Sequence, residues 1–300
     1  MLDVRSEVGR LRRVLVHAPG VEVDHMVPEM MEELLFDDIL FGERAREEHA
    51  RFRRLLTALD VEVQDMRDLL VQALAAEGAR EWMLNAMLDD VSSPVADRMR
   101  AAAASDLVDM FVTGVRWSES SDVLASEDLF EIVPVPNWCF QRDPQVVVGD
   151  SVVFSSMATL TRSREVLLSR AVFRFHPDFA STPVLHDPLE VAPDRPLYIG
   201  MHQPRLEGGD VMVLSEDVVV VGYSERTNRS GVRHLVRALT RMENGPRRLV
   251  VVSLPHKRAY MHLDTVMTQI DPGHCLVFPP VILPGHDDTA CVYEFDRHDA

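Results

Sequence analysis

A unit in which an acidic motif is followed by a β-hairpin recurs three times in this chain, and this repeat most constrains its fold. Asp143, Asp210 and Asp264 each precede a run of strand-forming residues and a turn, and they are separated by 67 and then 54 residues. The expected hairpin strands cover 146–148 with 152–154, 211–214 with 218–221, and 265–270 with 275–278. Repetition at this length indicates modules around a common centre, so the three acidic motifs should converge there.

The remaining elements fit an α/β chain with one helical segment. Helices are expected near 43–59, 164–173 and 232–239, and further strands near 11–20, 61–63 and 249–252. Alanine, leucine and methionine dominate from about residue 66, and strand patterns vanish there. We therefore expect a helical insertion over 66–126 within a single domain spanning 1–300.

The acidic motifs carry side chains suited to binding a cation and moving protons. A strand's period of two would place His262 and Asp264 on one face and Leu263 on the other. Buried carboxylates such as Glu207 and Asp143 are costly unless a cation compensates them, and a guanidinium group binds carboxylates bidentately. An imidazole beside an acid can act as a general acid or base.

A ligand with a carboxylate at its other end would need different partners. Asn137, Arg164 and Arg226 lie near the acidic motifs in the sequence and suit that end. A ligand with both ends is an amino acid such as arginine.

The acids and the histidine of these motifs are also compatible with two simpler roles. Any single acid among them can be a solvated turn residue or a helix cap, and Gly208-Gly209 alone indicates only a turn. Glu207, His262 and Asp264 together could also bind a metal ion. Because the motifs contain a single histidine, we expect no metal.

The charge balance limits the classes of partner that the protein is expected to bind. Acidic residues outnumber basic residues 48 to 31, which gives a net charge of −17. This acidity disfavours nucleic acid and anionic membranes as partners and suits a cationic small molecule. Cys139, Cys275 and Cys291 show no paired spacing, and no apolar run approaches the ~20 residues needed to span a bilayer. We expect a cytoplasmic protein.

The motifs together resemble the bacterial arginine deiminase family. The similarity rests on PNWCFQRDP at 136–144, LEGGD at 206–210, SERTN at 224–228 and MHLDTVMT at 261–268. The segments LLFDDILF and REEH near the amino terminus and REVLLSR at 164–170 are also similar. The resemblance runs over nearly the whole chain. It implies a pentein fold, a five-bladed α/β propeller of ββαβ modules with a helical insertion, and a homo-oligomer.

The resemblance also implies an activity and a role for each motif. Members of the family hydrolyse L-arginine to L-citrulline and ammonia through a covalent cysteine adduct, without a cofactor. Asp143 and Asp264 would bind the guanidinium group, and Glu207 and His262 would transfer protons. The implied substrate-binding residues are Asn137, Phe140, Arg164, Arg226 and Asp210. Arg162 is an alternative to Arg164, because the local similarity is loose.

One family feature is not found in the sequence. The family's nucleophilic cysteine lies near the carboxyl terminus, in a segment with glycine and arginine that has no counterpart before Ala300. Cys139, Cys275 and Cys291 do not match its surroundings, and Cys275 is expected in the core. We therefore expect an incomplete last module without the nucleophile. The alternatives are an inert arginine-binding or guanidine-binding pentein, an amidinotransferase and a dimethylarginine hydrolase.

Overall fold

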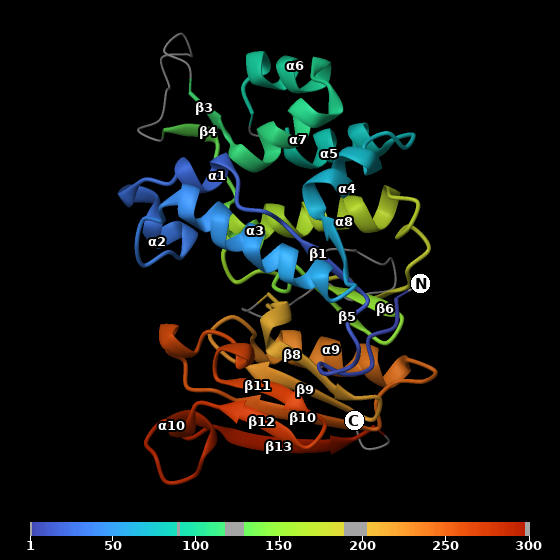
Figure 1. The fold of residues 1–300 in the computed structure, drawn as a ribbon. Helices are drawn as coiled ribbons and strands as arrows, with labels where there is room; N and C mark the ends of the chain where they lie inside the picture. The colour runs from blue at the N-terminus through green and yellow to red at the C-terminus, as the bar shows by residue number, and fades with distance from the viewer. Residues whose placement is uncertain (1, 89–90, 118–128, 189–202, 298–300) are drawn as a thin grey trace. The chain divides into compact units, whose positions relative to one another are not determined.

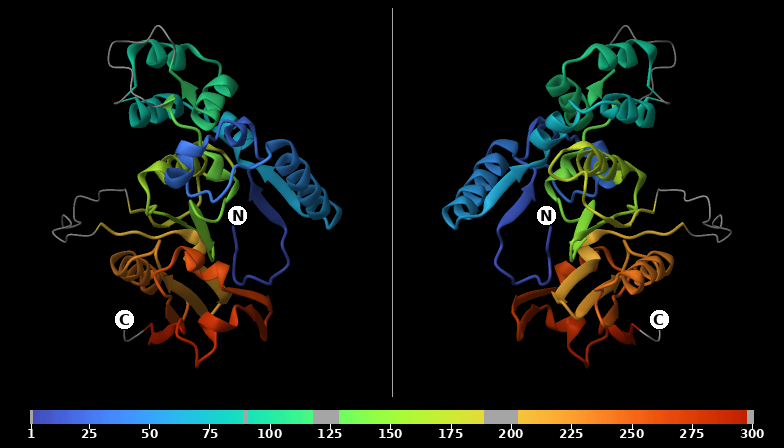
Figure 2. Two further views of the ribbon diagram at one scale, coloured as in Figure 1. Left: turned by 90° about the vertical axis from the view of Figure 1, so that its left-hand side faces the viewer. Right: turned by 90° about the vertical axis from the view of Figure 1, so that its right-hand side faces the viewer.

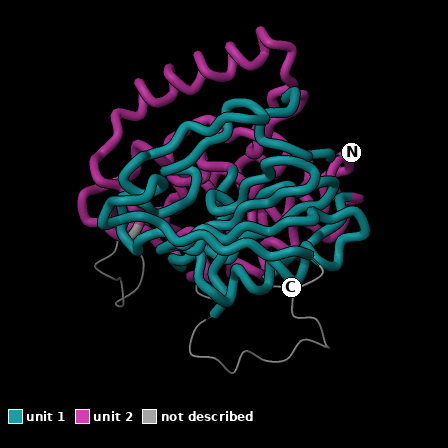
Figure 3. Tube along the Cα trace, turned by 90° about the horizontal axis from the view of Figure 1, so that it is seen from below, with its two compact units in different colours: residues 1–11, 142–160, 182–300 teal, residues 12–141, 161–181 magenta. Residues whose placement is uncertain are grey.

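The computed structural model describes residues 2–88, 91–117, 129–188 and 203–297 (Figure 1). They form two compact units (Figure 3). Unit 1 comprises 1–11, 142–160 and 182–300, and unit 2 comprises 12–141 and 161–181. The single domain over 1–300 stays a prediction, and residues 89–90 and 118–126 of the expected insertion lie outside the described residues.

Unit 1 contains the first two expected hairpins, each followed later in the chain by a parallel third strand. β5 (Gln145–Val148) pairs antiparallel with β6 (Ser151–Phe154), and β6 pairs parallel with β7 (Val184–His186). β8 (Val211–Ser215) pairs antiparallel with β9 (Val218–Tyr223), and β9 pairs parallel with β10 (Arg248–Ser253). Valine-rich runs around short polar turns explain both hairpins.

In the second sheet, strands β8, β9 and β10 are packed on both faces, whereas the edge strand β13 is exposed. The strand order of this sheet is β13-β10-β9-β8, and α9 (Arg229–Arg241) lies along one face (Figure 2). Because side chains alternate along a strand, Val211, Val219 and Leu249 pack with Leu235 of α9 on that face. Residues such as Met212, Val220 and Val252 pack on the other face with Leu263, Val266 and Val281. The turn that follows His262 is thereby fixed to the sheet through Leu263.

The third hairpin differs from the first two. β11 (Met267–Asp271) and β12 (His274–Val277) form a two-stranded sheet. The short α10 (Pro279–Ile282) follows, and β13 (Cys291–Asp296) then pairs antiparallel with β10 rather than with β12. Within the described chain, only the first two hairpins therefore acquire a parallel third strand.

Unit 2 combines a small parallel sheet with helices. β1 (Arg13–Val16) pairs parallel with β2 (Glu62–Asp65), and α3 (Gly42–Ala58) connects them after the short segments α1 (Val21–Asp24), η1 (Pro28–Met30) and α2 (Met31–Leu34). Four helices follow: α4 (Met66–Ala73), α5 (Ala79–Met87), α6 (Ser93–Ala101) and α7 (Ala104–Thr113). Residues 66–113 are therefore mainly helical in the described chain, and the insertion over 66–126 stays a prediction. β3 (Val115–Arg116), β4 (Phe130–Ile132) and α8 (Ser163–Phe175) complete the unit.

No helix in the described ranges is both long enough and apolar enough to cross a bilayer.

Candidate active site

The acidic motifs of unit 1 are short turns that lead into strands. Gly208–Asp210 forms the 3-10 turn η4 directly before β8, and Asp143 lies two residues before β5. The third motif corrects the sequence analysis, because Leu263–Thr265 is the 3-10 turn η6 and not part of a strand. Thr265 Oγ1 donates to the carbonyl of His262 at 2.6 Å and closes this turn. His262 Nδ1 still lies 4.0 Å from Asp264 Oδ1, so the turn brings together two side chains that a strand was expected to align.

Glu207 and His262 form the centre of the cluster. His262 Nε2 lies 2.7 Å from Glu207 Oε2, and both side chains are buried. Glu207 Oε1 accepts a hydrogen bond from the amide of Ala158 at 2.8 Å and lies 3.9 Å from Arg226 Nη1. The buried carboxylate is thus fixed in position by a backbone donor and faces two cationic side chains.

Asp143 and Asp264 lie on the other side of the imidazole ring. His262 Nδ1 is 3.7 Å from Asp143 Oδ1. One ligand-type atom from each of Asp143, His262 and Asp264 lies within 4.8 Å of the others, and no second such group of three acids, histidines or cysteines occurs in the described ranges. Two carboxylates and an imidazole suit a small metal ion as well as an organic cation. No cysteine belongs to this group.

The cluster perturbs its own protonation states. Burial opposes charge on His262, but the Glu207 hydrogen bond and the negative charge of Asp143 raise the pKa of the imidazole to about 9. Burial raises the pKa of Asp264 to about 6, against the opposing effect of His262, while Asp143 raises it further. A proton held on His262 and a carboxylate that titrates near neutrality are features of sites that transfer protons.

Asp210 supports the cluster through hydrogen bonds within the protein. Its carboxylate accepts from Ser224 Oγ at 2.6 Å and from the amide of Leu263 at 2.9 Å. Burial raises its pKa to about 7, although His262 and Ser224 lower it. Since Asp210 is completely buried, these contacts suit a residue that positions the 262–265 turn.

The two glycines of the second motif are required by close packing. A Cβ atom on Gly208 would lie 1.9 Å from the carbonyl oxygen of Arg142, and one on Gly209 would lie 2.6 Å from His262 Nδ1. Both distances are far below van der Waals contact. The pair is therefore more than a turn signal, because it lets the backbone pass directly beneath the imidazole.

Arg142 is a site residue to which the sequence analysis gave no role. Its guanidinium group binds Glu7 through two hydrogen bonds of 2.7 and 2.9 Å and donates to the carbonyl of Gly208. It thereby connects the segment of Asp143 to the glycine turn. Glu7 lies 135 residues away in the sequence, so no local pattern could have indicated the pair.

The remaining predicted substrate-binding residues lie in unit 2, apart from Arg226. Asn137 is buried and donates from Nδ2 to the carbonyl of Leu34 at 2.6 Å, whereas the side chain of Phe140 is half exposed. Arg164 donates to the carbonyl of Val133, and burial lowers its pKa to about 10. Arg162 forms a buried bidentate ion pair with Glu165 at 2.8 and 3.0 Å. In unit 1, Arg226 is buried beside Glu207.

None of the three cysteines has the surroundings of an activated thiolate. Burial, together with the charge of Glu165, raises the pKa of Cys139 to about 12. Cys275 on β12 and Cys291 on β13 are exposed. The expectation that Cys275 lies in the core is therefore wrong, and the physical reason is that β12 has β11 as its only strand partner in the described chain and presents its side chains to solvent.

Comparison with known proteins decides the family. The arginine deiminase family model matches residues 32–291. The chain belongs to the arginine deiminase family. It is 33% identical over 295 residues to an arginine deiminase of Latilactobacillus sakei, covering 93% of this chain and 70% of that protein. It is 33% identical over 298 residues to an arginine deiminase of Limosilactobacillus fermentum, covering 94% and 70%.

The fold of this arginine deiminase family member is similar to that of related enzymes in solved structures. An amidinotransferase of Microseira wollei, SxtG, aligns with a TM-score of 0.51 at 16% identity, covering 92% of this chain and 68% of that one. AgrE, solved as a complex with L-arginine, aligns with a TM-score of 0.50 at 16% identity, covering 90% and 27%. These similarities agree with the expected mixed α/β pentein fold.

Proposed function

We propose that the chain carries the substrate-binding and proton-transfer residues of an arginine deiminase, an enzyme that hydrolyses L-arginine to L-citrulline and ammonia. The observation that carries the proposal is the buried Glu207–His262 pair with Asp143 and Asp264 beside the same imidazole ring. Family membership gives this arrangement its substrate class.

In this proposal, Asp143 and Asp264 bind the guanidinium group of the substrate. Two carboxylates near a buried imidazole carry excess negative charge, and burial has already raised the pKa of Asp264 to about 6. A guanidinium group offers five N–H donors in a plane and can satisfy both acids through bidentate hydrogen bonds. Binding it would remove the electrostatic cost that the two neighbouring acids impose on the fold.

Glu207 and His262 take the proton-transfer role. Deimination replaces one guanidinium nitrogen by the oxygen of water: a C–O bond forms, the C–N bond breaks, and the two protons of water leave with the nitrogen as ammonium. His262 carries a proton at neutral pH because its pKa is about 9, and it can deliver that proton to the leaving nitrogen. The carboxylate of Glu207 stabilises the imidazolium and can accept the proton of water.

The family resemblance implies that a cysteine thiolate first attacks the guanidinium carbon and that water then hydrolyses the adduct. We assign this step to none of Cys139, Cys275 and Cys291. The first is held as a thiol, because its pKa is about 12. The other two are exposed and lie outside the Asp143–His262–Asp264 group.

For the amino-acid end of the substrate we propose Asn137, Phe140, Arg164 and Arg226, with Arg162 as the alternative to Arg164. Asp210, predicted as a further substrate residue, is proposed to act by positioning, since both its oxygens bind protein donors. The proposal for Arg226 is supported by its burial beside Glu207 and by its Nη1 atom, which has no hydrogen-bond partner within the described part of the chain.

We further propose the five-bladed propeller of ββαβ modules, with residues 66–126 as an insertion. Supporting it, β8, β9, α9 and β10 follow the ββαβ order with a parallel closing strand. β5, β6 and β7 show the same strand pairing. We also propose a homo-oligomer in the cytoplasm that binds neither nucleic acid nor membrane, in keeping with the net charge of −17.

The test is a parallel measurement of arginine binding, citrulline and ammonia. We expect L-arginine to bind. Any citrulline should appear with one ammonia per citrulline, and Glu207→Gln should abolish that turnover while the protein stays folded. Binding without citrulline would favour the inert guanidine-binding alternative. Absence of both binding and turnover would contradict the proposal.

A further inference from the structure

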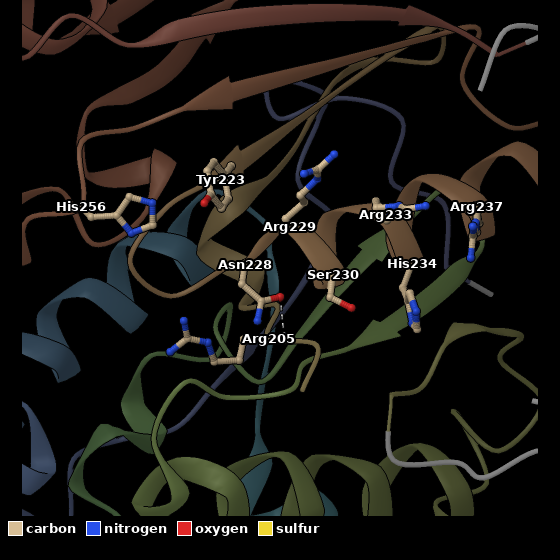
Figure 4. Close-up of a pocket in the computed structure, with 9 residues that line it drawn as sticks. All are labelled: Arg205, Tyr223, Asn228, Arg229, Ser230, Arg233, His234, Arg237 and His256. Carbon is tan, nitrogen blue, oxygen red and sulfur yellow. Dashed lines mark hydrogen bonds between the residues drawn. The ribbon is translucent and has the colours of Figure 1, made fainter. Parts of the chain in front are cut away.

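Unit 1 contains a basic cavity that is separate from the acid cluster (Figure 4). Its volume is about 590 Å³, which is the size of a small-molecule site. Four arginines line it: Arg205, Arg229, Arg233 and Arg237. None of the described residues that line it is acidic. In a chain in which acids outnumber bases 48 to 31, composition alone does not produce such a cavity.

Three of these arginines form a row along α9. Arg229, Arg233 and Arg237 follow one another at intervals of four residues, and Figure 4 shows them along the same stretch of the helix. Residues four apart are neighbours on a helix surface, about 6 Å apart along its axis. Like charges at this spacing destabilise a helix. In the described part of the chain, no carboxylate pairs with any of the three or with Arg205.

The start of α9 adds donors to the same cavity. Asn228 caps the helix by accepting from the amide of Gly231 at 2.9 Å. The amides of Arg229 and Ser230, which come first in the helix, meet no acceptor among the described residues. Unpaired amides at a helix start favour an anion, and here they coincide with the arginine row.

The two walls of the cavity are fixed to each other. Asn228 Oδ1 also accepts from the amide of Arg205 at 3.1 Å, and Asn228 Nδ2 donates to the carbonyl of Gln203 at 2.7 Å. A Cβ atom on Gly231 would lie 1.9 Å from the carbonyl oxygen of Arg205, so the two segments are in direct contact. The arginines therefore project from a rigid frame, which lowers the entropic cost of binding.

We propose that this cavity binds an oligophosphate group, as found in a nucleoside triphosphate or in inorganic polyphosphate. Arginines one helical turn apart, about 6 Å along the axis, can bind several phosphates of one chain through bidentate hydrogen bonds, whereas a single small anion would satisfy at most one or two of them. Tyr223 and His256 pack edge to face at the rim, with ring centroids 5.1 Å apart, and offer an aromatic surface to a nucleobase.

The test is calorimetric titration of the whole chain with inorganic tripolyphosphate, with ATP and with orthophosphate. We expect tripolyphosphate and ATP to bind, and to bind more weakly as salt is raised. The Arg233→Ala, Arg237→Ala double variant should weaken both by about tenfold or more. Arg241→Ala is the matched control, because Arg241 is an exposed arginine of the same helix that does not line the cavity. The affinity of this variant for tripolyphosphate and ATP should stay within about twofold of the wild-type value.

The two sources of the ligand are distinguished by comparing affinities. Tighter binding of ATP than of tripolyphosphate would identify a nucleotide and assign the base to Tyr223 and His256, whereas equal binding would identify inorganic polyphosphate. The Arg233→Lys variant keeps the positive charge and should retain part of the affinity for tripolyphosphate. This result would show that the alanine variants bind weakly because they lose charge and not because they misfold. The proposal would be overturned if neither tripolyphosphate nor ATP bound at millimolar concentration, or if Arg241→Ala lost as much affinity as the double variant. It would also be overturned if orthophosphate bound with equal affinity, or if RNA bound and the triphosphates did not.

Discussion

The Nε2 atom of His262 lies 2.7 Å from Oε2 of Glu207, in a contact where both side chains are almost completely shielded from solvent. The two residues are 55 positions apart in the sequence and come from the turns that precede different hairpins. A buried imidazole loses hydration, so it stays protonated only while a carboxylate compensates it. The protonation of His262 therefore depends on Glu207.

Replacing Glu207 by Gln should lower the pKa of His262 from about 9 to a value near or below its usual 6.5. The variant loses the charged hydrogen-bond acceptor but keeps the desolvation that disfavours the imidazolium ion. The measurement is an NMR titration of the His262 ring protons in both proteins. An unchanged titration midpoint would show that Asp143 and the other acids suffice to hold the proton.

Stability should fall as the pH rises from about 6.5 to about 9. His262 has a raised pKa in the folded protein, so its contribution is complete below the unfolded value of 6.5 and is lost as the pH passes about 9. The contribution is on the order of 1–3 kcal/mol. Urea unfolding of the wild type and of His262→Gln across this range measures it. Parallel curves for the two proteins would exclude the histidine as the source.

Gly209→Ala should displace His262. The new methyl group would lie 2.6 Å from Nδ1 and 3.0 Å from the carboxylate of Asp264, so the ring or the turn must move. We expect about a tenfold or larger loss of arginine affinity, measured by calorimetry. Gly273→Ala, where the nearest atom is 3.6 Å away, is the matched control and should bind normally. Equal behaviour of the two variants would show that the glycine turn does not hold the ring.

The cysteines should differ in reactivity. Cys139, with a pKa of about 12, is held as a thiol at pH 8, whereas Cys275 and Cys291 are exposed. Iodoacetamide followed by mass spectrometry should therefore label Cys275 and Cys291 first and leave Cys139 largely unmodified. Fast labelling of Cys139 would reopen its assignment as a nucleophile.

Much of unit 1 follows from local patterns. The valine-rich runs around Gly149 and Asp217 predicted their hairpins, since strand period and turn residues are properties of neighbouring positions. The motif at 262–264 was assigned to a strand because its alternation is also short-range, yet the structure has a 3-10 turn there. The turn is set by the Asp210 carboxylate, which accepts from the amide of Leu263 from 53 residues away.

The site shows the same division between local and distant information. Family motifs indicated Asp143, Glu207, His262 and Asp264. The structure places the three carboxylates around the imidazole ring of His262. The partnership of Arg142 with Glu7 and the need for glycine beneath His262 depend on tertiary contacts that no single segment encodes. The basic row of α9 is visible at a spacing of four residues, but the absence of acidic partners among the described residues is known only from the fold.

The central claim is that Asp143 and Asp264 recognise the guanidinium group of arginine, and calorimetric titration with L-arginine tests it most directly. We expect Asp143→Asn and Asp264→Asn each to weaken binding by about tenfold to a hundredfold, because each loses a charged hydrogen bond. Asp217→Asn, in the exposed turn between β8 and β9, should not change it, and uncharged L-citrulline should bind the wild type more weakly. Wild-type affinity for arginine in both site variants, or equal losses in Asp217→Asn, would contradict the account.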